Sequence, residues 1–199
     1  MNNDESQWLV RAIEGDDDAF ARLVGIYQKP VYNLCYRMLG NANDAEDAAQ
    51  EAFLRAYKAM ARYDQNRSFA TWLLSIASHY CIDQLRKRRF MTFSLDDDER
   101  YWFKPPDPGP RPETALLMSE KQAQVQVMLD ILAPKDRAAV VMRYWYKYSY
   151  QEIAQSLSLT VSAVKSRLHR ARRQLADHWQ SQQVQSLTAE RICNESPAF

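Results

Sequence analysis

Residues 149–175 have the sequence SYQEIAQSLSLTVSAVKSRLHRARRQL, which predicts two helices joined by a short turn. Ser149 and Glu152 have the spacing of a capping box, in which each satisfies a free backbone amide at a helix start. Thr160 is the expected N-cap of the second helix. In that helix apolar residues recur every three or four positions, and basic residues occupy the other faces. The pattern predicts a helix-turn-helix whose second helix is basic.

The outer surface of this second helix is the candidate DNA-binding surface. Arginine, lysine and serine side chains reach both phosphates and base edges when a helix enters the major groove. A basic surface helix in a bundle is the alternative interpretation, but the matched caps and the apolar stripe favour DNA binding. We expect Arg167 and Arg170 to contact bases. The candidate DNA contacts are Lys165, Ser166, Arg167, His169, Arg170 and Arg173.

The rest of the chain is predicted to be almost entirely helical. Only 4 glycines occur, and apolar residues recur at helical spacing rather than in alternation. Residues 103–112 hold five prolines in ten positions, which excludes regular structure because proline fixes φ and lacks an amide donor. The fold class is therefore all-α, with two small domains that we expect to move independently about a proline-rich linker. The predicted parts are a first domain at 1–90, the linker at 91–115, a helix-turn-helix domain at 116–180 and a tail at 181–199.

A helix after Gly40 has an apolar stripe and a separate charged face. The predicted stripe consists of Ala45, Ala49, Ala52, Phe53, Ala56 and Tyr57. Asp47, Glu51 and Arg55 follow one another at spacings of four on that face. An ordinary solvated face is the alternative interpretation, with an ion pair from Glu51 to Arg55 that would stabilise the helix by only about 0.2–0.5 kcal/mol.

An aromatic-rich block at 63–80 is followed closely by the basic run 86–89. Rings that stack on bases, beside cations that hold the backbone, are typical of sites for single-stranded nucleic acid. For Trp72, a place in the hydrophobic core is the simpler interpretation. The charges agree with two nucleic-acid sites: the net charge is only +1, yet 67–89 holds 5 bases and 1 acid, and 121–180 holds 10 bases and 4 acids.

Enzymatic and membrane functions have little support in the sequence. His79, His169 and His178 lie in basic helices, and neither a glycine-rich phosphate loop nor a pair of acids forms a candidate active site. The 3 cysteines are widely scattered, so we expect reduced thiols, no metal site and no cofactor. The start lacks the features of a signal peptide and the apolar stretches are short, which predicts a cytoplasmic protein without membrane insertion.

Five segments, taken in order, resemble a known family. They are DAEDAAQEAF at 44–53, FATWLLSIA at 69–77, DQLRKRR at 83–89, YQEIA at 150–154 and VKSRLHRARRQL at 164–175. Together they resemble the sigma factors of bacterial RNA polymerase, specifically the extracytoplasmic-function group of the sigma-70 family.

The resemblance implies a promoter-specificity subunit that binds core RNA polymerase and promoter DNA. Asp47, Gln50 and Glu51 would bind the clamp helices of the polymerase β′ subunit, and the second domain would also meet the β flap. The last helix would recognise the minus-35 element as duplex, the linker would pass near the RNA exit path, and an anti-sigma factor is a further candidate partner. The residues implied for the minus-10 element are Asp64, Gln65, Asn66, Arg67, Ser68, His79, Asp83 and Arg86.

The sequence departs from the family pattern at two positions and in its tail. His79 stands where many members have asparagine, Ala163 replaces a frequent threonine, and the tail 181–199 has no counterpart. A stand-alone helix-turn-helix regulator is the alternative function. It leaves the acidic helix and the basic end of the first domain unexplained, and it would be favoured by palindromic DNA binding of the protein alone.

Overall fold

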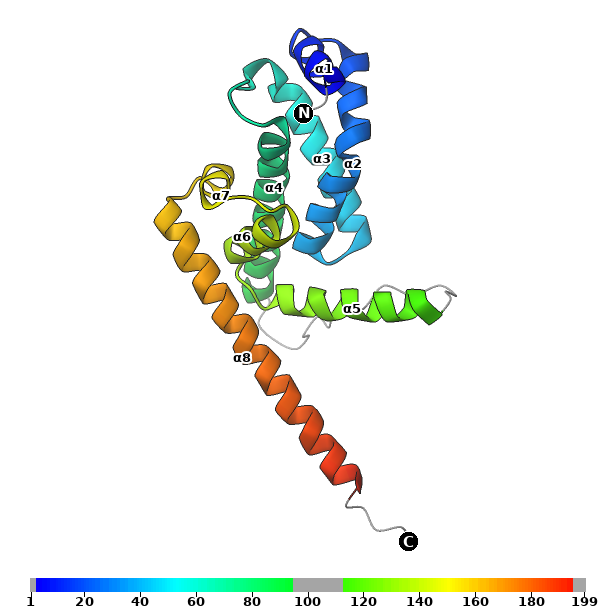
Figure 1. Ribbon diagram of the computed structural model, residues 1–199, viewed down its shortest axis with the longest axis vertical. Helices are drawn as coiled ribbons and strands as arrows, with labels where there is room; N and C mark the ends of the chain where they lie inside the picture. Colours follow the sequence, from blue (N-terminus) through cyan, green and yellow to red (C-terminus); the bar gives the residue numbers. More distant parts are fainter. Residues whose placement is uncertain (1–2, 95–112, 195–199) are drawn as a thin grey trace.

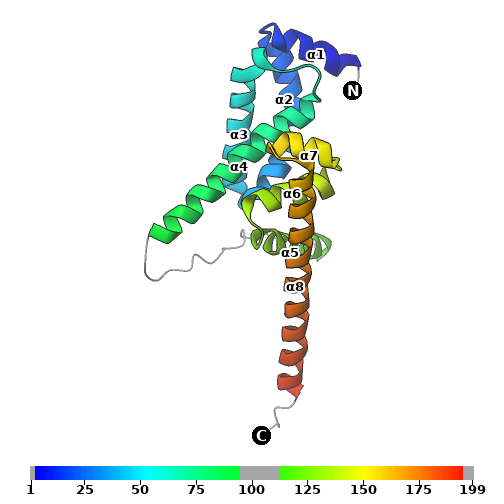
Figure 2. The same cartoon turned by 90° about the vertical axis from the view of Figure 1, so that its left-hand side faces the viewer.

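The computed structural model describes residues 3–94 and 113–194, and side chains at 4–89 and 122–181. The described chain is helical without strands, as the sequence predicts (Figures 1 and 2). The predicted linker lies largely outside the described residues. The helices are α1 (Asn3–Ile13), α2 (Asp17–Leu39), α3 (Ala42–Ala59), the 3-10 turn η1 (Met60–Arg62), α4 (Phe69–Ser94), α5 (Glu113–Asp130), α6 (Pro134–Trp145), α7 (Tyr150–Leu157) and α8 (Val161–Asn194).

The first domain consists of α1 to α4, which pack around a common core. Local signals fix the helix ends: Asp16 accepts a hydrogen bond from the Ala19 amide at 3.0 Å and so caps α2. Gly40 ends α2 with φ 76°, a left-handed conformation that suits glycine. Asn41 then caps α3 by accepting from the Asp44 amide at 3.1 Å. The predicted alanine stripe of α3 is buried against α2 and α4.

Four aromatic rings of the first domain pack together beside the turn that precedes α4. Phe69 is buried and contacts Tyr27, Tyr63 and Trp72, with ring centroids 5.3 to 5.7 Å apart. Trp72 is half-buried in this cluster, as the core interpretation predicts. Tyr57 differs from the predicted apolar stripe of α3: it is exposed and its hydroxyl donates to Asp17 at 2.6 Å.

The helix-turn-helix is formed by α7 and α8, which pack against each other and against α6. The predicted capping box is present: the Ser149 amide donates to Glu152 at 2.7 Å, and the Glu152 amide donates to the Ser149 hydroxyl at 3.2 Å. Ser158 ends α7 in the left-handed region with φ 53°. Thr160 caps α8 by accepting from the Ala163 amide at 3.1 Å. Hydrogen bonds between neighbouring residues therefore define where α7 begins and ends and where α8 begins.

The α8 helix continues past the predicted end of the second domain, to Asn194. Its C-terminal half projects from the body of the molecule, away from α6 and α7 (Figure 1). The first part of the predicted tail is thus a continuation of α8, the second helix of the helix-turn-helix.

The two domains pack directly on each other, which differs from the expected independent movement. Helices α6 and α7 contact α2 and α4 of the first domain. Arg137 of α6 donates to the Met38 carbonyl oxygen at 2.7 Å, and the Tyr146 hydroxyl donates to the Pro30 carbonyl oxygen at 2.6 Å. The buried Arg137 and the part-buried Tyr146 thus find hydrogen-bond partners on the other domain, which favours a fixed arrangement.

Three further observations concern the class of protein. Cys35 and Cys81 are free and buried. Among the described residues, no group of histidine, cysteine and acidic side chains could hold a metal ion. In the same part of the chain, no helix has the length and apolar content needed to cross a membrane.

Candidate nucleic-acid interface

The exposed side of α8 carries a stripe of polar side chains near its N-terminus. Ser162, Ser166, His169 and Arg173 are exposed and lie at spacings of four, three and four, so they share one face. The opposite face holds the buried apolar residues, which pack on α6 and α7. Ser162 was not among the predicted contacts; its signal is its place on this stripe rather than its charge.

Arg167 and Arg170 of the predicted set are held by a buried acid. The guanidinium of Arg167 lies 2.6 Å from Asp136 of α6, and that of Arg170 lies 3.1 Å from it. The Asp136 side chain is only 3% exposed, whereas those of Arg167 and Arg170 are 27% and 55% exposed. The two arginines therefore satisfy a buried charge and fix α8 on α6, and Arg170 also remains accessible from outside.

Lys165 lies on the flank of the helix, where its ammonium is 5.8 Å from the ring centroid of Tyr150. Arg143 lies over the same ring at 5.0 Å. These contacts orient Lys165 beside α7 and leave it exposed.

The loop 64–68 is exposed throughout, yet it has a defined conformation. The Asn66 amide and side-chain nitrogen both donate to Asp64 at 3.0 Å, and the Arg67 amide donates to the Asp64 carbonyl at 3.0 Å. The hydroxyl of the buried Tyr63 donates to the Arg67 carbonyl oxygen at the end of the loop. Burial raises the pKa of Tyr63, which keeps this hydroxyl protonated as a donor. The loop therefore presents its polar side chains on a fixed backbone.

His79, Asp83 and Arg86 lie at spacings of four and three on one face of α4, and all three are exposed. The Nδ1 atom of His79 lies 2.8 Å from the Ser75 carbonyl oxygen, so it acts as the donor and leaves Nε2 directed away from the helix backbone. His79 is ten residues after the start of α4, about 15 Å along the helix axis. The predicted minus-10 residues thus form two groups, the loop and this face.

The acidic face of α3 contains the predicted polymerase contacts Asp47, Gln50 and Glu51, of which the first two are exposed. Glu51 accepts from Arg55 at 2.7 Å, so the predicted ion pair is present. Leu54 follows on the same side of the helix and is 46% exposed. The sequence analysis did not single it out; an apolar residue outside the alanine stripe is the signal that could have found it.

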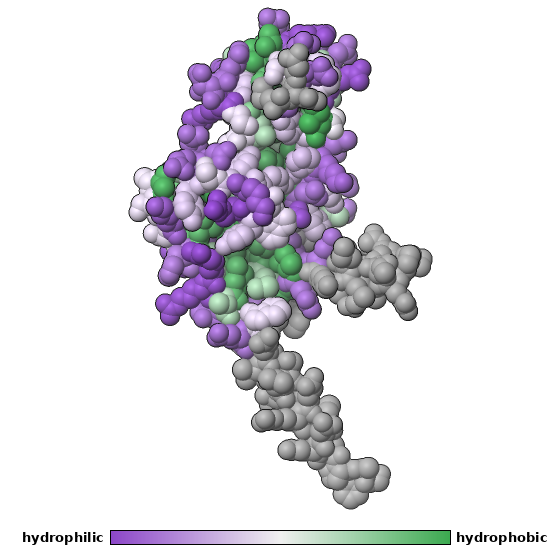
Figure 3. Space-filling model, viewed as in Figure 1, coloured by the Kyte–Doolittle hydropathy of each residue, from purple (hydrophilic) through white to green (hydrophobic). Residues whose placement is uncertain are grey.

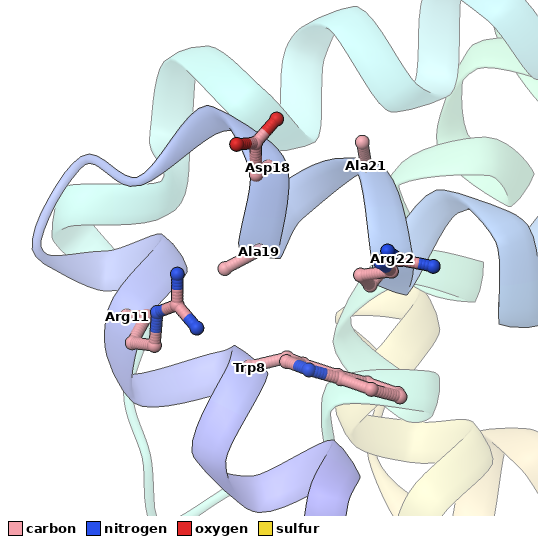
Figure 4. A pocket seen from close by; sticks show the side chains of 6 residues that line it. All are labelled: Trp8, Arg11, Asp18, Ala19, Ala21 and Arg22. Atoms are coloured by element: carbon pink, nitrogen blue, oxygen red, sulfur yellow. The ribbon is translucent and has the colours of Figure 1, made fainter.

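A hollow of about 690 Å³ lies between α1 and the start of α2, away from all the predicted residues. Figure 4 shows the Trp8 ring along one side, with Arg11 and Arg22 beside it. Arg11 is paired with Asp16. The face of the molecule in Figure 3 is mainly hydrophilic, and hydrophobic residues gather at the level of α5 and α8. These features do not extend the candidate interface.

The fold and the exposed surfaces define a DNA-binding protein with one helix-turn-helix and a second helical domain. Residues 23–91 match the family model of sigma-70 region 2, and residues 122–175 match that of sigma-70 region 4. The chain is 40% identical over 168 residues to the ECF RNA polymerase sigma factor SigW of Bacillus subtilis, covering 81% of this chain and 89% of the relative. It is 32% identical over 179 residues to the RNA polymerase sigma-H factor of Pseudomonas aeruginosa, covering 86% and 92%. The chain belongs to the extracytoplasmic-function sigma factors of the sigma-70 family.

A solved structure supports the same fold. CnrH in complex with the cytosolic domain of CnrY superimposes with a TM-score of 0.66 at 23% identity, covering 90% of this chain and 99% of CnrH. Its family membership, shown by the two family models and the curated relatives, makes the chain a promoter-recognising subunit of RNA polymerase. The match to region 2 accounts for the first domain, which the stand-alone regulator left unexplained.

Proposed function

We propose that three exposed surfaces of this sigma factor divide promoter recognition and polymerase binding. The exposed face of α8 recognises the minus-35 duplex. The loop 64–68 and one face of α4 bind the minus-10 element. The acidic face of α3 binds the β′ clamp helices. The observation that carries the proposal is the helix-turn-helix itself, in which a buried acid anchors a helix whose opposite face is polar and exposed.

On α8, the proposed contacts separate into two roles. Ser162, Ser166, His169 and Arg173 form the exposed stripe and would meet base edges and phosphates directly. Arg167 is the positioning residue, since it is only 27% exposed and is paired with Asp136. The exposed Lys165 and Arg170 flank the stripe and suit the two phosphate backbones beside the groove.

In the first domain, the loop and the face of α4 suit different parts of an opened promoter. The five loop residues 64–68 present amides, a carboxylate and a hydroxyl, which can bond to the edges of unpaired bases. Arg86 provides a cation for phosphate, whereas His79 provides an exposed Nε2. Asp83 lies 3.9 Å from Arg86 and would orient it.

On α3, Leu54 supports the proposed polymerase surface. Interfaces commonly have an apolar centre and a polar rim. Here an exposed leucine lies beside Asp47, Gln50 and Glu51, which form such a rim. The β′ surface would be basic, with an apolar site for the leucine.

The remaining assignments follow from the role of a sigma factor. We propose that the chain works in the cytoplasm, that the polymerase and not this chain carries out the chemistry, and that the functional units are 1–90, 116–180 and the intervening linker. The second domain would also contact the β flap. An anti-sigma factor is the proposed regulator; the sigma factor RpoE of Bartonella quintana, a fold relative with a TM-score of 0.59 at 19% identity, was solved in complex with the anti-sigma factor NepR.

Site-specific crosslinking in the holoenzyme tests the division of surfaces. A photoreactive amino acid at Ser166 should crosslink to the minus-35 duplex, and one at Asn66 should crosslink to the non-template strand of the minus-10 element. The same group at the exposed Glu14 serves as the control and should give no DNA crosslink. Crosslinks from Ser166 to the minus-10 element, or none from either position, would overturn the assignment.

A further inference from the structure

The hollow between α1 and the start of α2 lies apart from the three surfaces assigned above. Its volume is about 690 Å³. Pockets that bind small molecules commonly have volumes of about 300–1,000 Å³. The space can therefore hold a molecule of nucleotide size. Its lining residues are Trp8 and Arg11 of α1 with Asp18, Ala19, Ala21 and Arg22 of α2.

The two helices that form the hollow are tied together at two points. Arg11 of α1 lies 2.5 Å from Asp16, and Asp16 caps α2 by accepting from the Ala19 amide. Further along, the Tyr27 hydroxyl of α2 donates to Glu5 of α1. The hollow is thus formed before any ligand arrives, which lowers the cost of ordering the site on binding.

One wall of the hollow is an aromatic ring. Trp8 packs against the core of the first domain but is only half-buried. Figure 4 shows its ring along the edge of the hollow. A ring fixed on one side and open on the other suits a stacked heterocyclic base, which every nucleotide contains.

Two guanidinium groups face the same space. Arg11 uses its Nε and Nη2 atoms for Asp16, so the donors on Nη1 remain for a ligand. Arg22 has no ion-pair partner among the residues whose side chains are described. Asp18 is four residues earlier on α2, a spacing that allows an ion pair, yet Figure 4 shows Arg22 beside the Trp8 ring instead. Guanidinium groups in such positions suit phosphate oxygens.

The remaining lining residues are an exposed acid and two alanines. The Asp18 carboxylate can accept hydrogen bonds from ribose hydroxyls, the role that an acid has in many nucleotide sites. Ala19 and Ala21 project only methyl groups and so leave the centre of the hollow open. A ring, two cations and an acid thus surround one space.

We propose that this hollow binds a ribonucleoside diphosphate or triphosphate. The base stacks on Trp8, the phosphates bind Arg22 and Arg11, and the ribose hydroxyls donate to Asp18. A nucleotide within single-stranded DNA offers the same base and phosphate, but its deoxyribose has no free hydroxyl for the acid. The free ribonucleotide is therefore the better match. The inference does not depend on the proposed function, because the site lies outside the promoter and polymerase surfaces.

Two variants test the hollow, each with a control seven residues further along α2. Arg22→Met removes a phosphate-binding cation, and Lys29→Met removes a cation outside the hollow. Ala21→Leu fills the space, and Gln28→Leu adds the same side chain outside it. All four residues are exposed, so the core is untouched. Seven residues are nearly two helical turns, which keeps each control on the same side of α2 about 10 Å away.

Calorimetric titration of the full chain with ADP is the first measurement. The parent should bind one ADP with a Kd of about 10 µM to 1 mM. Arg22→Met and Ala21→Leu should each weaken binding at least about tenfold, the effect of losing a hydrogen bond to a charged group or the space itself. Lys29→Met and Gln28→Leu should match the parent. No saturable binding up to about 1 mM, or an equal loss in the controls, overturns the inference.

Further ligands identify which part of the nucleotide each residue binds. Adenosine, which lacks phosphates, and 2′-deoxy-ADP, which lacks the 2′-hydroxyl, should both bind more weakly than ADP. A single-stranded DNA oligonucleotide should not compete with ADP. Competition by the oligonucleotide at a lower concentration than ADP itself would assign the hollow to DNA and overturn the proposal of a free nucleotide.

Thermal unfolding provides an independent measurement and a check on folding. Without ligand, all four variants should unfold close to the parent temperature. ADP should raise the unfolding temperature of the parent and of both controls in a concentration-dependent way, because a ligand that binds only the folded chain stabilises it. ADP should leave Arg22→Met and Ala21→Leu nearly unchanged at the same concentrations. Equal stabilisation of all five proteins would contradict binding in this hollow.

Discussion

Nη1 of Arg167 on α8 lies 2.6 Å from Oδ1 of Asp136, a carboxylate that is 3% exposed on α6. Arg170 approaches the same carboxylate at 3.1 Å, so one buried acid holds two arginines of α8. These two ion pairs fix the rotation of α8 about its own axis. They thereby decide that Ser166 and Arg173, rather than Arg167, point to the open side.

Replacing Asp136 by alanine should destabilise the second domain by about 1–3 kcal/mol, the range for losing hydrogen bonds between charged groups. The cost is moderated because both arginines retain some access to water. Urea unfolding measures it. Asp177→Ala is the control: that carboxylate is 69% exposed, lies 4.0 Å from Arg173, and should contribute less than about 1 kcal/mol. Equal effects of the two substitutions would contradict the anchoring role.

Charge reversal on α3 should weaken polymerase binding without unfolding the domain. Asp47→Lys or Glu51→Lys should lower the affinity for core polymerase at least about tenfold, or 1.4 kcal/mol, because like charges would then face each other. Leu54→Ala should also lower it. Affinity is measured beside circular dichroism, with Glu14→Lys as a charge-matched control. If Glu14→Lys weakens binding as much as Asp47→Lys, the face has no special role.

The sequence predicted those features that depend on neighbouring residues. The Ser149 and Glu152 capping box, the end of α2 at Gly40 and the alanine stripe of α3 follow from local hydrogen bonding and helical spacing. Asp136 could not be assigned in this way, because its partners lie 31 and 34 residues further along the chain.

The packing of the domains was also beyond the sequence. Arg137 and Tyr146 donate hydrogen bonds to backbone carbonyl oxygens of α2. Every residue has a backbone carbonyl, so the sequence does not indicate which carbonyls accept these bonds. The expectation of independent domains came from the proline-rich composition of 103–112. Composition predicts a linker, but it does not predict whether the two domains that the linker joins pack against each other.

His79 should act in promoter opening rather than in duplex binding. His79→Ala should reduce transcription from a closed promoter and recover much of it on a template with a pre-opened minus-10 bubble, because the side chain lies where unpaired bases are proposed to bind. Tyr144→Phe provides an exposed control outside this surface. A loss of duplex affinity with no rescue by the bubble would place His79 elsewhere in the mechanism.

Alanine substitutions along α8 should separate phosphate contacts from base contacts. Loss of a phosphate contact, expected for Lys165 and Arg170, should weaken all promoters alike and reduce the salt slope by about one unit. Loss of a base contact, expected for Ser166 and Arg173, should relax specificity at one position of the minus-35 element and cost about 1–3 kcal/mol where the contact is bidentate. Measuring promoter binding by the holoenzyme at several salt concentrations, and on promoters with single-base changes, distinguishes the two kinds of contact.

Arg167→Ala should instead lower the stability of the second domain, because Arg167 is anchored by Asp136. A change of promoter specificity without a loss of stability would contradict this anchoring.

The most direct test of the account is run-off transcription by core RNA polymerase with and without this chain, on a promoter selected from random sequence by the reconstituted holoenzyme. The account predicts a discrete product that requires the chain, starts downstream of two separated DNA elements, and is lost when either element is scrambled. Product of equal amount and start site without the chain, or chain-dependent protection of a palindromic site in the absence of polymerase with no transcription, would contradict it.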